Sequence, residues 1–293
     1  DHGRQCRGAA PLHWLENENS GGYAIRIIKS PTKSSAKVAP KPLVESSANI
    51  TAKLPLKLSL KENLLQLLFP RRCPVCGQIV LPEGALICAG CVQKLHFIRQ
   101  PSCKKCGTEL ISDREEYCPD CKRRHRSFES GVALIRYNDV AQKSMAAIKY
   151  KNRREYLDFY AEAIVRRYGN FFARHKEAVL VPVPVHPVRL RSRGFNQAGE
   201  LAVRLGRLSG LSVNETMLIR TRKTAPQKEL GPEERLRNLR KAFAVRKSTL
   251  PATVILVDDI YTTGSTIEAC TRVLKEAGVR EVYFVSICIG GGV

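Results

Sequence analysis

Two adjacent carboxylates, Asp258 and Asp259, follow the apolar run TVILV and precede a stretch rich in hydroxyl groups. Two close carboxylates repel each other unless a cation or hydroxyl groups satisfy them, which suggests Mg²⁺ or sugar hydroxyls as partners. The apolar run predicts a strand, and ligands of open parallel sheets bind beyond the carboxyl ends of the strands. Inside a strand one of the two side chains would be buried and unpaired. We therefore expect both to lie at the strand end and to turn toward a ligand.

The next residues, TTGST at 262–266, are suited to binding an anion. They open a predicted helix, and the free backbone N–H groups and positive dipole end of a helix N-terminus attract negative charge. Gly264 allows close approach of the backbone. Hydroxyl donors come from the other four members of the stretch, which are Thr262, Thr263, Ser265 and Thr266. A capped helix without a ligand is the competing interpretation. The patterns of a nucleoside-triphosphatase P-loop and of a dinucleotide-binding turn are absent from the sequence.

Basic residues are concentrated directly before the acidic pair. The chain has a formal net charge of +22, and residues 181–250 hold 15 basic against 5 acidic residues. This excess favours anionic partners, whether phosphates, nucleic acid or an acidic membrane surface, although a solvated basic surface would show the same composition. The arrangement suits a phosphorylated ligand whose metal ion must also be held.

The stretch VHPVRLRSRG follows an apolar run and fits a loop that binds pyrophosphate. It would bring Arg189, Arg191 and Arg193 to the carboxyl edge of the sheet. Lys149 and Lys151 are candidates for the same anion. A solvated basic loop is the alternative. His186 in this stretch is assigned a structural rather than a catalytic role.

The polar segment RTRKTAPQKELGPEERLRN is punctuated by Pro and Gly and predicts a mobile cover over a ligand. Its best candidates for ligand contact are Gln227, Arg235 and Asn238. Its length would equally suit a disordered insertion.

Eight cysteines form four C-x2-C couples, each separated from the next by eleven residues. Tetrahedral metal sites use this spacing, so disulfides are disfavoured and two structural zinc sites with four thiolates each are predicted. Pairing the couples in sequence order gives Cys73, Cys76, Cys88 and Cys91 as one site, and Cys103, Cys106, Cys118 and Cys121 as the other. An interleaved pairing, first couple with third, stays open, and redox sensing is the alternative role for such thiols. Cys270 and Cys288 are expected in the apolar core.

Apolar strands alternate with helices after about residue 132, which predicts an α/β domain with a parallel sheet covered on both faces. Strands are predicted at 132–137, 178–185, 253–259 and 281–289. Helices are predicted over 141–172, with an interruption around 149–154, and over 195–210 and 265–278. A further helix is predicted at 59–69, where Ser59 and Glu62 form a capping-box pair. No secretory signal or membrane-spanning apolar run is recognised, so we expect a cytoplasmic protein with reduced thiols.

The stretch VILVDDIYTTGST resembles the signature with which type I phosphoribosyltransferases bind 5-phosphoribosyl-1-pyrophosphate (PRPP). AIKYKNRRE (147–155), VPVPVHPVRLRSRGFNQA (181–198), TAPQKELGPEERLRNLRKAF (224–243) and the cysteine region resemble the ComF family of late-competence, amidophosphoribosyltransferase-like proteins. The resemblance covers about residues 64–289 and keeps the order of the family.

This resemblance implies a type I phosphoribosyltransferase fold behind a small N-terminal double zinc ribbon. The resemblance implies a helix and the ribbon over 59–126 and the phosphoribosyltransferase-like domain over 127–293. Residues 1–58 include the stretch SPTKSSAKVAPKPLVESSAN, whose composition predicts a disordered tail or linker. The resemblance also implies that Asp258 and Asp259 hold the ribose 2′- and 3′-hydroxyls of Mg²⁺-bound PRPP, while residues 262–266 cradle its 5-phosphate.

Two functions follow from the resemblance. In the first, which does not exclude the second, the protein binds Mg²⁺-PRPP and takes part in natural competence or DNA uptake. It is an enzyme in which the two carboxylates stabilise the positively charged sugar as pyrophosphate departs. In the second, it is a catalytically inactive module that binds PRPP or single-stranded DNA and acts with competence proteins in DNA uptake. The acceptor nucleophile and the oligomeric state are not encoded in any recognisable motif.

Overall fold

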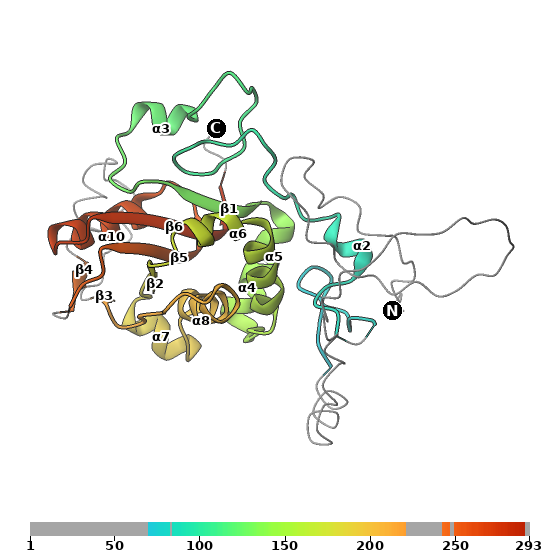
Figure 1. Cartoon of the computed structure of the whole chain (residues 1–293). Helices are drawn as coiled ribbons and strands as arrows, with labels where there is room; N and C mark the ends of the chain where they lie inside the picture. The colour runs from blue at the N-terminus through green and yellow to red at the C-terminus, as the bar shows by residue number, and fades with distance from the viewer. Residues whose placement is uncertain (1–69, 83, 221–241, 247–248, 291–293) are drawn as a thin grey trace, which may run out of the picture. The chain divides into compact units, whose positions relative to one another are not determined.

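The computed structural model describes residues 70–82, 84–220, 242–246 and 249–290. Its centre is a parallel sheet of four strands in the order β1-β6-β5-β2 (Figure 1). The strands are β1 (Gly131–Arg136), β2 (Val179–Pro182), β5 (Thr253–Tyr261) and β6 (Glu281–Ile289). All four predicted strands and their parallel arrangement are confirmed. Within the described residues, no helix has the length and apolar character needed to span a bilayer.

The helices between the strands begin and end where the sequence provides caps. Asn138 accepts a hydrogen bond from the N–H of Ala141 at the start of the first long helix, and Asn196 does the same for Ala198. Gly210 adopts a left-handed conformation (φ 79°) after another helix, as Gly often does at this position. The helices are α4 (Asp139–Lys151), α5 (Tyr156–Arg167), α6 (Gly169–Arg174), α7 (Pro187–Arg193), α8 (Gln197–Ser209) and α10 (Ser265–Glu276).

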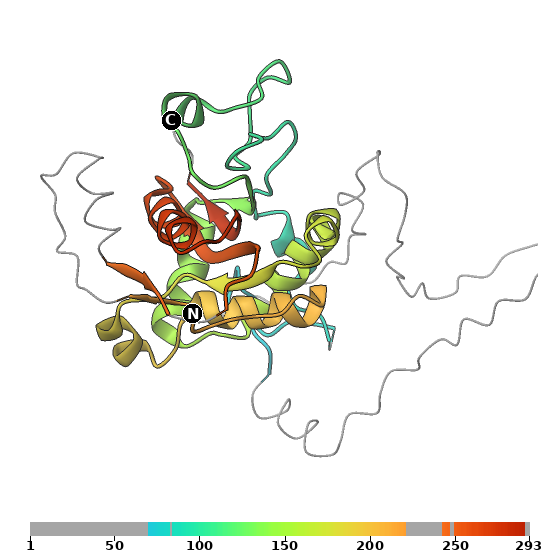
Figure 2. The same ribbon diagram turned by 60° about the vertical axis from the view of Figure 1, so that its left-hand side comes forward.

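Each face of the sheet has its own apolar core, because strand side chains alternate between faces. On one face, Ile255 and Val257 of β5 pack with buried residues of α4, α5 and α8. On the other face, Val254 and Leu256 pack with α10. Figure 2 shows α10, in red, on the side of the sheet opposite to α8, in yellow-orange. Cys270 and Cys288 are fully buried, as expected of core residues.

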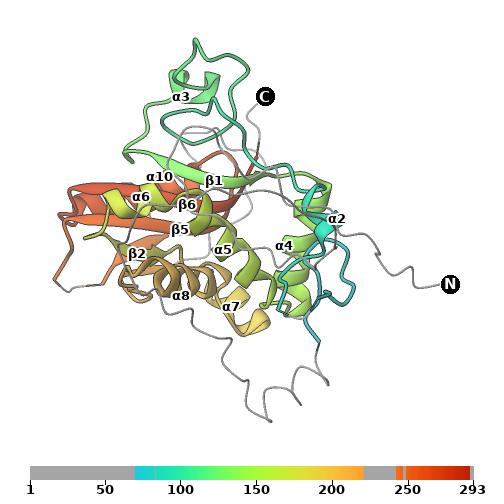
Figure 3. The same ribbon diagram turned by 45° about the vertical axis from the view of Figure 1, so that its right-hand side comes forward.

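The cysteine region folds as two similar units, here called the first ribbon (residues 71–92) and the second ribbon (residues 101–123). Each begins with a tight turn whose glycine has a positive φ, 72° at Gly77 and 76° at Gly107. Each ends in a short helix, α2 (Ala89–Val92) or α3 (Pro119–Arg123). Cys103, Cys106 and Cys118 of the second ribbon belong to the core on the α10 face. Figure 3 shows α3 beyond β1 and α2 near α4, so the two ribbons contact different parts of the sheet domain.

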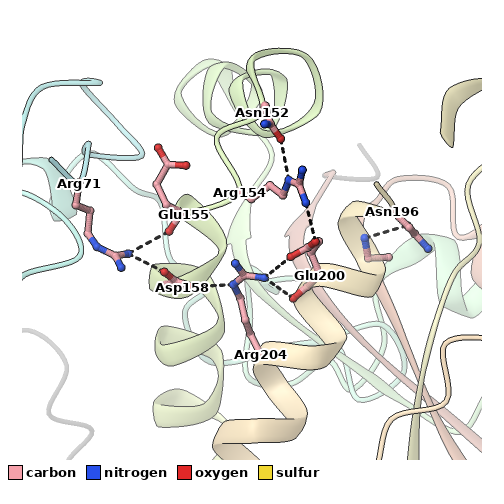
Figure 4. Close-up of polar contacts among 9 residues, drawn as sticks. Arg71, Asn152, Arg154, Glu155, Asp158, Asn196, Glu200 and Arg204 are labelled. Carbon is pink, nitrogen blue, oxygen red and sulfur yellow. Dashed lines mark hydrogen bonds and ion pairs between the residues drawn. The ribbon is translucent and has the colours of Figure 1, made fainter. Parts of the chain in front are cut away.

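The first ribbon is tied to the domain by a chain of ion pairs (Figure 4). Arg71 donates to Asp158 of α5 at 2.8 Å, and Asp158 also accepts from Arg204 of α8 at 2.6 Å. Arg204 and Arg154 then share Glu200, at 2.7 and 3.2 Å. Desolvation alone would raise the pKa of Asp158, but its hydrogen bonds from the two arginines hold the pKa below its ordinary value. This network links the first ribbon to α5 and α8.

The structure adds one element that the sequence patterns did not predict. A two-stranded antiparallel sheet pairs β3 (Leu218–Arg220) with β4 (Phe243–Val245). In sequence these strands stand on either side of the polar segment 221–241; Arg220 is paired with Phe243, and β4 contacts α10. Three residues each are too few for a periodic pattern in the sequence. The helix predicted at 59–69 lies outside the described residues.

Gly131 provides a test of the packing between β1 and β6. A Cβ atom at this position would lie 2.0 Å from Cε1 of the fully buried Phe284 ring. We expect Gly131→Ala to lower the free energy of unfolding by about 1–3 kcal/mol, since overpacking forces neighbours off their rotamers. Urea denaturation checks this, with Gly169→Ala as the matched control because no atom lies within 4 Å of its added Cβ. Equal stability of the two variants would contradict the packing described here.

Candidate functional site

The acidic pair lies inside β5 rather than beyond its end, which corrects the prediction that both side chains turn toward a ligand. β5 continues to Tyr261, and Asp258 is paired in register with Ser286 of β6. The neighbouring strand β2 is shorter and ends at Pro182, opposite Val257. Both aspartates therefore lie just past the end of β2 while remaining in strand conformation. Strand alternation sends their side chains to opposite faces of the sheet.

Asp259 is buried and contacts a cation and an amide on neighbouring helices. It forms an ion pair with Lys149 near the end of α4 and accepts a hydrogen bond from Nε2 of Gln197 at 3.3 Å. Gln197 is the first residue of α8, and its Oε1 accepts from Arg193 at 3.1 Å. A cation and an amide thus compensate the burial of this carboxylate inside the strand. From the sequence alone, we expect a carboxylate buried there to have no partner.

Asp258 faces the other side and lines a small hollow together with residues 260–267. Its Oδ1 accepts a hydrogen bond from the N–H of Asp259 at 2.9 Å. Desolvation and the charge of Asp259 hold the pKa of Asp258 well above its ordinary value. Burial and the nearby Asp258 carboxylate likewise raise the pKa of the Cys270 thiol in α10. An ionised Asp258 therefore favours a cation or a hydroxyl donor in the hollow.

The loop between β5 and α10 has the geometry of an anion site. Gly264 has φ of 72° and precedes the first residue of α10. A Cβ at this position would lie 2.3 Å from Oη of Tyr261, so only glycine fits. Thr262 and Thr263 are exposed, and the hydroxyls of Thr263 and Ser265 are 2.9 Å apart. The hydroxyl-bearing residues and the helix N-terminus thus lie together at the hollow that Asp258 lines.

The basic residues predicted as a loop form a short helix, which corrects that expectation. α7 starts at Pro187, with Nδ1 of His186 accepting from the N–H of Val188 at 3.2 Å, and ends before Gly194 in a left-handed conformation. His186 thus caps a helix. Proline at the first position and glycine after the last are typical helix boundaries that the sequence interpretation did not use.

Of the basic residues predicted to bind pyrophosphate, some are exposed and others are held by neighbouring side chains. Arg189 and Arg191 are exposed on α7, and Lys151 is exposed at the end of α4. Arg193 stacks over the ring of Tyr150 at 5.1 Å, and Lys149 is held by Asp259. The candidates Gln227, Arg235 and Asn238 lie outside the described residues.

Three site residues were missed by the sequence interpretation. Gln197 connects Asp259 to Arg193, and Tyr150 is 74% exposed beside Arg193. Arg220 is the last residue of β3 and lies near Arg189 and Asp258. Burial is the main cause that lowers its pKa, and the charge of Arg189 is the next. Tyr150 and Gln197 stand in the stretches AIKYKNRRE and RGFNQA, so their position beside the predicted ligands was a usable signal. Arg220 had no signal, because its strand was not predicted.

The thiols form two groups of four, in the sequence-order pairing rather than the interleaved one. Cys73, Cys76, Cys88 and Cys91 place their Sγ atoms within 4.8 Å of one another, as do Cys103, Cys106, Cys118 and Cys121. The Sγ separations of 3.9 Å for Cys76–Cys88 and 3.7 Å for Cys106–Cys118 fit a tetrahedron of bonds of about 2.3 Å, whose edges are roughly 3.8 Å. Four thiolates leave no open coordination position, so a zinc ion in either group is structural.

Comparisons with known proteins agree with this geometry. The family model described as a double zinc ribbon domain matches residues 64–122, and the phosphoribosyl transferase domain model matches residues 152–291. Competence protein F of Haemophilus influenzae is 28% identical over 226 residues, which cover 73% of this chain and 95% of the relative. Competence protein ComFC of Bacillus subtilis is 28% identical, with 68% of this chain and 82% of the relative covered. DNA utilization protein YhgH of Salmonella typhimurium is 25% identical, with 75% and 97% covered.

The chain is homologous, at 25–28% identity over most of its length, to proteins named competence protein F, ComFC and YhgH. It joins a double zinc ribbon to a phosphoribosyltransferase domain with a parallel sheet, as the resemblance implied. The two ribbons described above are therefore zinc ribbons. The boundaries at 58/59 and 126/127 stay predictions.

The pairing of the thiols can be tested by counting metal. We expect about two zinc ions per chain by elemental analysis of the purified protein. The double variant Cys76→Ser/Cys88→Ser removes two ligands of one group and should retain about one zinc. If the couples were interleaved, these two substitutions would damage both sites and no zinc would remain.

The raised pKa of Asp258 predicts a stability cost in the ligand-free protein. The folded state favours protonated Asp258, so the stabilisation is complete below the unfolded pKa and is lost as pH rises through the folded pKa. Asp258→Asn lacks this titration and keeps an acceptor for the N–H of Asp259. At neutral pH we expect the variant to unfold at a higher urea concentration than the wild type, by about 1 kcal/mol or more, with a smaller difference at pH 4. A variant less stable at both pH values would contradict this assignment.

Proposed function

We propose that the protein binds Mg²⁺-PRPP at the carboxyl end of β5. The observation that carries the proposal is the single hollow shared by Asp258 and residues 262–266. A carboxylate that needs hydroxyl or cation partners and a loop suited to a phosphate lie side by side. A phosphorylated ribose carries hydroxyl groups that could meet the carboxylate and a 5-phosphate that could meet the loop.

Each residue set has a defined task in this proposal. The backbone N–H groups and hydroxyls of residues 262–266 hold the 5-phosphate, and Asp258 accepts from ribose hydroxyls. Asp259 keeps Lys149 and Gln197 in place on the opposite face of the sheet. Arg189, Arg191 and Lys151 attract the pyrophosphate from α7 and α4. Magnesium bound with PRPP would neutralise charge between pyrophosphate and the carboxylates.

We further propose that this site supports phosphoribosyl transfer. The bond between the anomeric carbon and the pyrophosphate oxygen breaks, pyrophosphate leaves with the electron pair, and a nucleophile adds to the carbon. The carboxylate of Asp258 stabilises the positive charge that develops on the sugar, while Asp259 on the opposite face holds Lys149 and Gln197. Gln227, Arg235 and Asn238 stay the predicted contacts from the covering segment.

A second candidate is a role as a module in the uptake or utilization of DNA. The relatives carry names that refer to competence and to DNA utilization. On this chain, Tyr150 is 74% exposed with Arg193 over its ring, and Val188 and Leu190 are exposed on α7 among arginines. An exposed aromatic ring among cations is suited to stacking a base of single-stranded DNA while the phosphates are held. The reduced thiols that bind zinc suit a place in the cytoplasm.

Calorimetric titration of PRPP into the zinc-loaded protein, with and without Mg²⁺, tests the first candidate. We expect Mg²⁺-dependent binding that weakens at least tenfold in Asp258→Asn, since a charge-assisted contact of about 1.4 kcal/mol or more is lost. Asp139→Asn, an exposed carboxylate at the start of α4, is the matched control and should bind normally. Normal binding by Asp258→Asn would refute the proposed site.

The same variants separate the two candidates. Reversing the charges of Arg189 and Arg191 should weaken both PRPP and single-stranded DNA, whereas Asp258→Asn should weaken PRPP alone. Absence of PRPP binding, together with DNA binding that declines with salt, would favour the DNA module.

A further inference from the structure

The second ribbon reaches the candidate phosphate loop through one buried side chain, Arg126. The side chain is only 5% exposed. Its Nη2 donates to Oδ2 of Asp120 at 2.5 Å and to the backbone oxygen of Thr263 at 2.8 Å. Asp120 lies in α3 between two thiolates of the second metal group, Cys118 and Cys121. One guanidinium thus joins the metal-binding helix to the middle of the loop.

The next residue, Ser127, forms hydrogen bonds with α10, the helix that follows the loop. The N–H and hydroxyl of Ser127 donate to the carboxylate of Glu268 at 2.8 and 2.7 Å. Glu268 is 1% exposed in the first turn of α10, and Arg272 also donates to it at 2.7 Å. Burial alone would raise the pKa of Glu268, but these hydrogen bonds keep it below its ordinary value. The loop and the start of α10 are therefore fixed from the ribbon side by two separate contacts.

Aromatic packing completes this support beneath the loop. Phe128 is fully buried and meets Tyr261 edge-on at 6.4 Å and Phe284 at 5.1 Å. Tyr261 stacks on Phe284 at 4.8 Å, and its Oη lies directly under Gly264. Residues 126–128 therefore contact the loop or the residues on which it rests.

The contact with Thr263 fixes the direction of a peptide group. In a trans peptide the carbonyl and the following N–H point in opposite directions. Because the oxygen of Thr263 is turned to Arg126, the N–H of Gly264 is turned away from the ribbon. Glycine resists a flip of the peptide between Thr263 and Gly264 less than any other residue. A contact from outside the loop is therefore needed to keep this peptide in one orientation. A flipped peptide would present its carbonyl oxygen where a phosphate requires a donor.

We propose that Arg126 is a positioning residue through which the second zinc site holds the phosphate loop in its anion-binding conformation. The metal group fixes α3, α3 fixes Asp120, and Asp120 directs Arg126 at the carbonyl of Thr263. Only the identity of the ligand rests on the proposed function; the coupling of ribbon and loop stands on the contacts themselves. Coupling between two sites is reciprocal, so a phosphate ligand should also retain the zinc of this ribbon.

The first ribbon provides a matched control. Arg71 also reaches from a ribbon into the sheet domain, donating to Asp158 at 2.8 Å and to the backbone oxygen of Glu155 at 3.3 Å. Figure 4 shows Arg71 in contact with Asp158 of α5 and with the backbone of Glu155, and the network continuing from Asp158 to Arg204 of α8. Arg71→Gln removes a cation of the same kind with no expected effect on residues 262–268.

The experiment compares wild type, Arg126→Gln, Arg126→Lys and Arg71→Gln as full-length, zinc-loaded proteins. Hydrogen exchange is measured without ligand on peptides covering 262–268, with a peptide from α8 as internal reference. We expect roughly tenfold faster exchange of 262–268 in Arg126→Gln, with zinc content and the α8 peptide unchanged, and partial recovery in Arg126→Lys. Unchanged exchange in Arg126→Gln, or the same increase in Arg71→Gln, would overturn the coupling.

A second readout uses PRPP. The affinity for PRPP should fall in Arg126→Gln by a similar factor. In the wild type, bound PRPP should slow the rate at which a chelator removes one of the two zinc ions. That protection should be lost in Arg126→Gln. Failure of wild type to bind PRPP would refute the proposed function, while the exchange data would still decide the coupling. Bound PRPP that protects neither zinc would overturn the coupling.

Discussion

The repulsion between two adjacent carboxylates is the constraint around which the site is arranged. β5 separates Asp258 and Asp259 by sending them to opposite faces of the sheet, and each face then has to satisfy one charge. On one face, α4 supplies Lys149 and α8 supplies Gln197, so both helices must bring polar residues to the end of β5. On the other face Asp258 lines the hollow, and desolvation together with the charge of Asp259 raises its pKa. The hollow is the place where this charge can be compensated from outside.

The second ribbon is part of the same construction. It has few large apolar residues, yet three of its thiol side chains are buried in the core that covers the α10 face. A metal group of four thiolates can fix such a chain where a hydrophobic core of its own would be too small. The rigidity gained in this way extends to the loop, because Arg126 and Ser127 directly follow the ribbon and contact Thr263 and Glu268. The first ribbon uses ion pairs on the other face and leaves the loop untouched.

Sequence patterns predicted the long elements and the two thiol groups but not the local geometry. Continuous apolar runs identified β5 and β6, and the C-x2-C spacing identified both thiol groups, because these signals repeat over many residues. The burial of Asp259 was not predicted, since its partners Lys149 and Gln197 are 110 and 62 positions away in the chain. The sequence interpretation predicts a loop in place of α7, because it weighs the basic residues and not the proline and glycine that bound the helix. Arg126 resembled one more cation in a basic run, and only the fold shows its burial.

The geometry bears on whether the site favours binding alone or transfer. A neutral ribose gives Asp258 hydroxyl donors but brings no positive charge of its own. A sugar that becomes positively charged as pyrophosphate leaves supplies the missing charge at the same place. An interaction that is stronger with the charged sugar than with the ground state accelerates the reaction, whereas equal interaction with both would only tighten binding. A carboxylate whose pKa is raised in the ligand-free protein therefore favours the transferase over a module that merely holds PRPP, while Lys149 pairs with Asp259 on the opposite face.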